Sequence, residues 1–131
     1  MSYFFSTTLT NISFEDAIDK TKTALKNEGF GVLTEINIKN TLKNKLDVDI
    51  NPYTILGACS PKHAHQAISS EPNIGVFLPC NVIVRALDSN HISVSAVDPI
   101  ASMGTVENKN LATVAQEVES KLKKVINALK Q

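Results

Sequence analysis

Apolar residues recur along the chain with two different periods, and the period changes several times. Between Ser13 and Gly29 the apolar stripe follows helical spacing through Phe14, Ala17, Ile18, Thr21, Ala24 and Leu25. The same spacing returns near the C-terminus at Leu111, Val114, Val118, Leu122, Val125, Ile126 and Leu129. This period places apolar side chains on one face of a helix. Both segments are therefore predicted to be amphipathic helices.

Alternation of apolar and polar residues marks five segments that we expect to be strands. They cover residues 3–9, 30–36, 53–60, 80–87 and 91–97. The tight-turn sequence Asp88-Ser89-Asn90 separates the last two strands, which predicts a hairpin. We also expect residues 73–78 to be extended and residues 98–104 to form a loop.

Three further signals mark the starts of helices. Ser13, Asn37 and Ser60 can each accept a hydrogen bond from the first turn of a helix. Ser60 is also followed by Pro61, and proline suits the first helical position. The expected order is β-α-β-α-β-α-β-β-α. Because the hairpin requires antiparallel pairing, the sequence favours an α+β fold with an antiparallel or mixed sheet covered by helices.

Composition limits the class of protein. A chain of 131 residues with 43% hydrophobic residues is expected to form a single domain over residues 1–131. Thirteen basic and thirteen acidic residues cancel, so we expect neither nucleic acid nor an anionic membrane as a partner. The start MSYFFSTTLT lacks the features of a signal peptide, and no window is apolar enough for a membrane span. We therefore expect a cytoplasmic protein.

The two cysteines lie in the stretches GACSPKHAH and LPCN, at Cys59 and Cys80. Cys59 is expected at the start of a helix, where the positive end of the helix dipole favours the reactive thiolate. The alternative is that Cys59 is a small buried residue at the end of a core strand. The two cysteines are 21 positions apart, which is far outside a C-x-x-C pair, so only folding could bring them together.

His63 and His65 suggest a metal site, but residues two apart on a helix point roughly 200° away from each other. One histidine is therefore expected to make a hydrogen bond at the boundary of the core, and the other to face solvent. A site built from Cys59, Cys80, one histidine and Met103 would suit copper(I) or zinc.

Asp98 directly precedes Pro99. Its carboxylate could bind a ligand in a cleft, or the Asp-Pro pair could simply start a turn. The candidate ligand-binding residues are Cys59, Ser60, His63, Cys80, Asn81 and Asp98. Cys59 and Cys80 are also the candidate metal ligands.

Several stretches together resemble a known family. GFGVLTEINIKNTLKNKL, ILGACSP with the following AHQAI, EPNIGVFLPCNVIV and SAVDP resemble the bacterial and archaeal family called domain of unknown function 302, over roughly residues 14–125. The resemblance implies a TATA-binding-protein-like α+β fold, in which a curved antiparallel sheet carries helices on one side, and usually a homodimer. It implies no reaction. Many members have asparagine where this chain has Ser60.

Three classes of function remain open. The first choice is a module that binds a small ligand or a soft metal ion near the cysteine segments. A structural or interaction homodimer would keep both cysteines in its core, and a thiol-dependent enzyme would use Cys59 with His63 or His65. With two tyrosines, five phenylalanines and no tryptophan, the chain has few large anchors for a different partner, which favours self-association. The sequence specifies no cofactor.

Overall fold

The computed structural model describes residues 2–131 and contains a five-stranded sheet. The strands are β1 (Phe4–Thr10), β2 (Gly31–Asn37), β3 (Tyr53–Cys59), β4 (Cys80–Ala86) and β5 (His91–Val97). They lie in the order β1-β5-β4-β3-β2, and each neighbouring pair is antiparallel. The predicted α+β class and the β4–β5 hairpin are confirmed.

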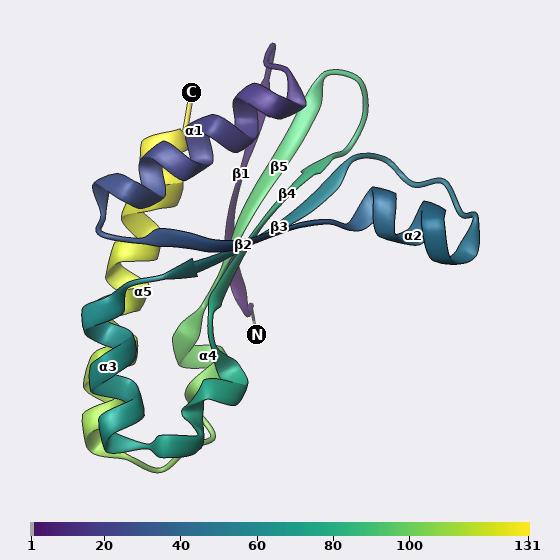
Figure 1. The fold of residues 1–131 in the computed structure, drawn as a ribbon. Coiled ribbons are helices and arrows are strands. Elements are labelled where there is room, and N and C mark those ends of the chain that lie inside the picture. The colour runs from purple at the N-terminus through teal and green to yellow at the C-terminus, as the bar shows by residue number, and fades with distance from the viewer. Residues whose placement is uncertain (1) are drawn as a thin grey trace.

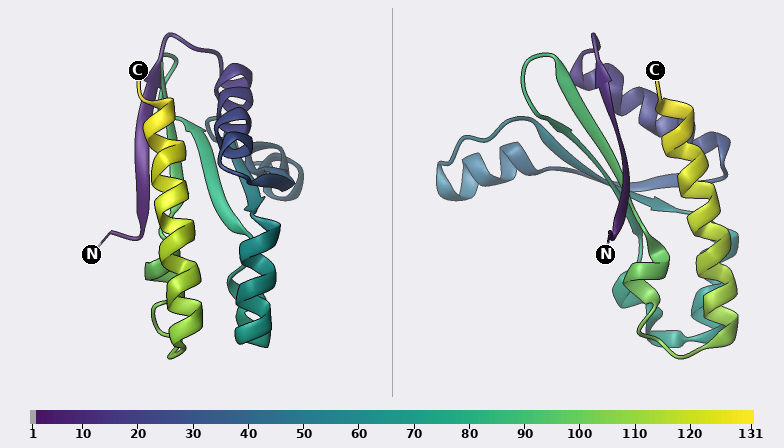
Figure 2. Two further views of the ribbon diagram at one scale, coloured as in Figure 1. Left: turned by 90° about the vertical axis from the view of Figure 1, so that its left-hand side faces the viewer. Right: turned by 180° about the vertical axis from the view of Figure 1, so that it is seen from behind.

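The helices gather mainly on one side of the sheet. They are α1 (Phe14–Asn27), α2 (Ile38–Leu46), α3 (Pro61–Ser70), the 3₁₀ helix η1 (Pro72–Phe77), α4 (Pro99–Met103) and α5 (Lys109–Leu129). The C-terminal half of α5 lies beside α1, and its N-terminal half lies beside α3 (Figure 2). In contrast, α2 stands away from the rest of the molecule (Figure 1). Among the described helices, none has both the length and the apolar character to cross a membrane.

The main hydrophobic core lies between the sheet and helices α1 and α5. Alternate residues of the strands face it, because successive side chains of a strand point to opposite faces. Its most buried members include Leu9, Leu56, Val82, Val84 and Val94 from the strands, and Leu25, Leu122 and Val125 from the helices. Most of both amphipathic stripes packs here, whereas Leu111 belongs to a second cluster.

Two short segments differ from the expectation. Residues 73–78 were expected to be extended, but residues 72–77 form η1, and the expected loop at 98–104 contains α4. Each short helix begins at a proline and buries an apolar residue, Ile74 in η1 and Met103 in α4. Their stability comes from this burial in a second, smaller cluster with Ala67 and Leu111. Such short segments show no helical period in the sequence.

Side-chain hydrogen bonds fix several ends of these elements. Ser13 accepts from the Asp16 backbone N–H, and Asn37 accepts from that of Asn40, so both predicted N-caps are confirmed.

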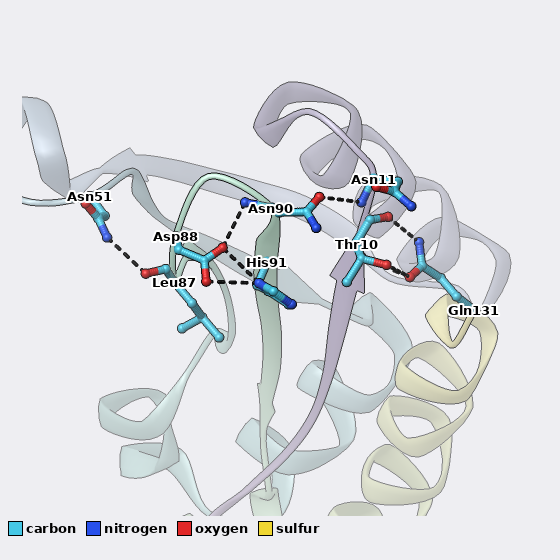
Figure 3. Close-up of polar contacts among 8 residues, drawn as sticks. All are labelled: Thr10, Asn11, Asn51, Leu87, Asp88, Asn90, His91 and Gln131. Carbon is cyan, nitrogen blue, oxygen red and sulfur yellow. Dashed lines mark hydrogen bonds and ion pairs between the residues drawn. The ribbon is translucent and has the colours of Figure 1, made fainter.

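The β4–β5 turn is closed by the Asp88 carboxylate, which contacts Asn90 and His91 (Figure 3). The backbone N–H of Asn90 and then the His91 side chain hold the pKa of Asp88 below its usual value. At the same end, Gln131 accepts from and donates to Thr10, which ties the C-terminal end of the chain to β1.

Candidate functional site

A cavity of about 30 Å³ lies where the end of β3 and the start of β4 meet α3, α4 and α5. Members of both the main core and the smaller cluster line it, and apolar residues such as Phe30, Ala67 and Val118 form much of its wall. A volume of this size would hold about two water molecules. The cavity therefore suits an ion or a very small group better than a large organic ligand.

Both cysteines line this cavity and both are free thiols. Ala58 is the register partner of Cys80 across the antiparallel β3–β4 pair, so Cys59 follows one position later at the same end of the sheet. Cys59 is half-buried, whereas Cys80 is 7% exposed. Burial, and secondarily the nearby Cys59, raise the pKa of Cys80 from 9.0 to about 11. Cys80 is therefore a neutral thiol at physiological pH.

The chain entering Cys80 packs closely against β3. Leu78–Pro79 is a cis peptide, and the Pro79 ring covers Gly57. A Cβ atom on Gly57 would approach Pro79 Cγ to 2.8 Å and would also collide with Thr34 Oγ1 of β2. The close approach of β2, β3 and Pro79 therefore requires glycine at position 57.

A chain of polar contacts leads away from the cavity. Ser60 Oγ lies 2.7 Å from His63 Nδ1, and His63 Nε2 lies 2.9 Å from Glu117 Oε2 on α5. His63 is 6% exposed, whereas the Glu117 side chain is 52% exposed. The three residues thus connect a buried cavity wall to the surface.

Ser60 occupies the N-cap position of α3, as expected, but its side chain accepts no hydrogen bond from the first turn. The prediction that Ser60 caps the helix is therefore wrong. The His63 ring, three positions later, competes with the backbone of the first turn for the serine hydroxyl. This ring is buried and contacts Glu117, and it forms the hydrogen bond with Ser60.

The two histidines lie in different environments, as their spacing on the helix predicts. His63 is buried with both ring nitrogens in hydrogen bonds, and His65 is exposed. The contacts of His63 therefore go to Ser60 and Glu117, not to either sulfur atom.

The structure brings four of the six candidate residues together at the cavity: Cys59, Ser60, His63 and Cys80. Met103 and Pro99 of α4 join them. Asn81 points to the opposite face of the sheet, because it alternates with Cys80, and it lines a separate hollow there. Asp98 accepts from the Ile100 backbone N–H and caps α4 instead of lining the cavity.

Sequence reasoning missed Glu117. It lies 54 positions from its partner His63 and looks like any exposed acidic residue on the polar side of α5. No local spacing signals this contact, which exists because α3 and α5 pack together.

Across residues 2–131, no group of three or more histidine, cysteine, aspartate or glutamate side chains is arranged to hold a metal ion. The residues that line the cavity include three that carry sulfur, Cys59, Cys80 and Met103. Thiolate and thioether ligands select soft metals such as copper(I).

Comparison with known proteins gives consistent results. A crystal structure of an uncharacterized conserved protein DUF302 from Bacillus stearothermophilus matches with a TM-score of 0.89 and 23% sequence identity, over 99% of this chain and 100% of that chain. This likeness shows the fold. A comparison with curated proteins gives no match. The family described as "Domain of unknown function DUF302" matches residues 5–129, and the chain belongs to this family.

Proposed function

We propose that the protein binds a single soft metal ion, copper(I), through the sulfur atoms of Cys59, Cys80 and Met103. The observation that carries this proposal is that all three residues line one small cavity whose wall is otherwise largely apolar. A cavity of about 30 Å³ accommodates an ion but leaves little room for a large organic ligand.

The donor set favours copper(I) over zinc. Structural zinc sites are almost always four-coordinate, and His63, the histidine that lines the cavity, already uses both ring nitrogens in hydrogen bonds. Copper(I) is selected by soft sulfur ligands. Because the pKa of Cys80 is raised to about 11, its proton must be displaced when the metal binds. Affinity should therefore increase with pH.

The test is an anaerobic titration of the reduced protein with copper(I) in competition with a chromogenic chelator. We expect one ion per chain, with binding abolished in Cys59→Ser and Cys80→Ser and weakened in Met103→Leu. His65→Ala is the matched control, since His65 is exposed and could bind copper adventitiously. Unchanged binding in both cysteine variants, or loss of binding in the histidine control, would contradict the proposal.

We also propose that the chain forms a homodimer through the open face of its sheet. The face opposite α1 and α5 carries exposed apolar side chains, including Phe4 at 40% and Ile36 at 43% exposure. Half-buried Ile55 and Ile83 lie on the same face. Zero net charge means that two copies do not repel each other over long range.

A thiol-dependent reaction at Cys59 has weaker support. Such a reaction needs a base beside the thiol, and the hydrogen bonds of His63 are directed to Ser60 and Glu117. His65 is exposed on α3.

A further inference from the structure

We propose that Ser60 is a nucleophile, that His63 is its general base, and that Glu117 positions the histidine. The activity would be transfer of a small acyl group from an activated ester to water. This function is distinct from metal binding. It rests on the continuous contacts Ser60 Oγ–His63 Nδ1 at 2.7 Å and His63 Nε2–Glu117 Oε2 at 2.9 Å. Such constellations are recognised by geometry and role rather than by sequence order.

The positions of the protons fit these roles. A serine hydroxyl that donates to Nδ1 requires the ring to carry its proton on Nε2. That N–H then donates to the Glu117 carboxylate, which fixes the tautomer and the ring orientation. The ring is also held by burial, with 6% exposure. His63 is therefore ready to take the serine proton.

The serine side chain is directed toward the base instead of the helix. At the N-cap of a helix a serine usually accepts from the first turn, but Ser60 does not. The amides of Lys62 and His63 belong to the first turn, where backbone N–H groups have no partner within the helix. Amides of this kind stabilise an oxygen that becomes negative during acyl transfer.

The cavity next to Ser60 limits the substrate. Its wall is largely apolar and its volume is about 30 Å³, so it accepts an acyl group of about two or three carbons. Ser60 itself is half-buried and is one of the residues that line the cavity. The class of substrate is thus an activated ester of a short carboxylic acid.

The reaction balances without a cofactor. Ser60 Oγ bonds to the carbonyl carbon while its proton moves to His63 Nδ1, and the ester C–O bond breaks as the leaving oxygen takes that proton. Water then attacks the acyl group on Ser60, gives one proton to His63 Nδ1, and releases the acid as Ser60 regains its proton.

The first experiment uses a fluorophosphonate probe on the intact protein, followed by peptide mapping by mass spectrometry. We expect an adduct on Ser60 and its loss in Ser60→Ala, while Ser69→Ala on the same helix labels like the wild type. His63→Gln should slow labelling by about 100-fold, since general-base catalysis typically contributes this much or more. A folded wild type that gives no Ser60 adduct, or labels equally in His63→Gln, would overturn the proposal.

The second experiment tests Glu117 as a positioning residue. Glu117→Gln should slow hydrolysis of p-nitrophenyl acetate and alter its pH profile, and Glu117→Asp should restore part of the rate. Glu119→Gln, on the same helix, is the control and should match the wild type. An unchanged pH profile in Glu117→Gln would refute the assigned role.

The two proposals fail separately. The double variant Cys59→Ser, Cys80→Ser should lose copper(I) and keep Ser60 labelling, whereas Ser60→Ala should keep copper(I) and lose labelling. A wild-type adduct that maps to Cys59 or Cys80 instead of Ser60 would place the nucleophilic activity on the thiols and overturn the role of Ser60.

Discussion

At the scale of single residues, Cys59 and Cys80 differ in environment although they share a cavity. Cys80 is 7% exposed at the start of a central strand, and burial raises its pKa to about 11. Cys59 is half-buried at the end of β3. Since the thiolate is the attacking form of cysteine, their reactivity should differ.

We predict that iodoacetamide modifies Cys59 at least about tenfold faster than Cys80 near neutral pH. A thiol with a pKa of about 11 is only about 0.01% thiolate at pH 7, and Cys80 is also poorly accessible. Mass spectrometry of the modified peptides gives both rates. In denaturant the two rates should become similar. Faster modification of Cys80 in the folded protein would contradict the described burial.

The same pKa shift predicts how stability depends on pH. Because folding raises the pKa of Cys80 from 9.0 to about 11, the neutral thiol contributes stability in full below pH 9. That contribution, on the order of 2–3 kcal/mol, is lost as pH rises through 11. Chemical denaturation at several pH values should show a steeper loss in the wild type than in Cys80→Ala. Identical pH dependence in the two proteins would refute the shift.

At the scale of elements, the cysteine corner depends on how closely β2, β3 and Pro79 approach one another. Gly57 is the contact point, with Thr34 on one side and Pro79 on the other. In the sequence, Gly57 lies inside the expected strand of residues 53–60. Glycine is needed at this position because Thr34 and Pro79 lie against it in the fold. In the sequence, Thr34 lies 23 positions before Gly57 and Pro79 lies 22 positions after it.

We predict that Gly57→Ala destabilises the protein by about 1–3 kcal/mol, the usual cost of overpacking. The added Cβ would displace Pro79, so iodoacetamide should also reach Cys80 more quickly. Gly31→Ala on β2 is the control, because a Cβ there meets no atom within 4 Å. Gly57→Ala with wild-type stability and wild-type Cys80 reactivity would show that the contact is not tight.

Most longer elements could be predicted because their periods are strong and their ends carry caps. The stripes of α1 and α5, the caps at Ser13 and Asn37, and the β4–β5 turn are local features. The helices η1 and α4 were missed because burial of one residue each, Ile74 and Met103, stabilises them. Ser60 was expected to cap α3. Its hydroxyl instead contacts His63, whose ring also contacts Glu117 of α5.

At the scale of the whole molecule, the candidate site is assembled from segments far apart in sequence. Cys59 and Cys80 meet because β3 and β4 are antiparallel neighbours, and Met103 joins them from α4. The chemistry of these residue types was enough to identify them as candidate ligands from the sequence. Their convergence, and the separation of Asn81 and Asp98 from them, follow from the strand register and the α4 cap.

The open face of the sheet leads to a prediction about assembly. We expect light scattering at tens of micromolar to give twice the mass of one chain. Ile83→Lys, on the open face, should shift the protein to monomer, because burying an unpaired charge is costly. Leu46→Lys on the projecting α2 is the control for adding a charge elsewhere. A monomeric wild type would contradict the proposed dimer.

The most direct test of the proposed copper(I) site is X-ray absorption spectroscopy of the copper(I)-loaded protein. We predict a first coordination shell of sulfur atoms only, with one sulfur fewer in Met103→Leu and no change in His65→Ala. A shell dominated by nitrogen or oxygen, or a sulfur shell that survives replacement of both Cys59 and Cys80 by serine, would contradict the site.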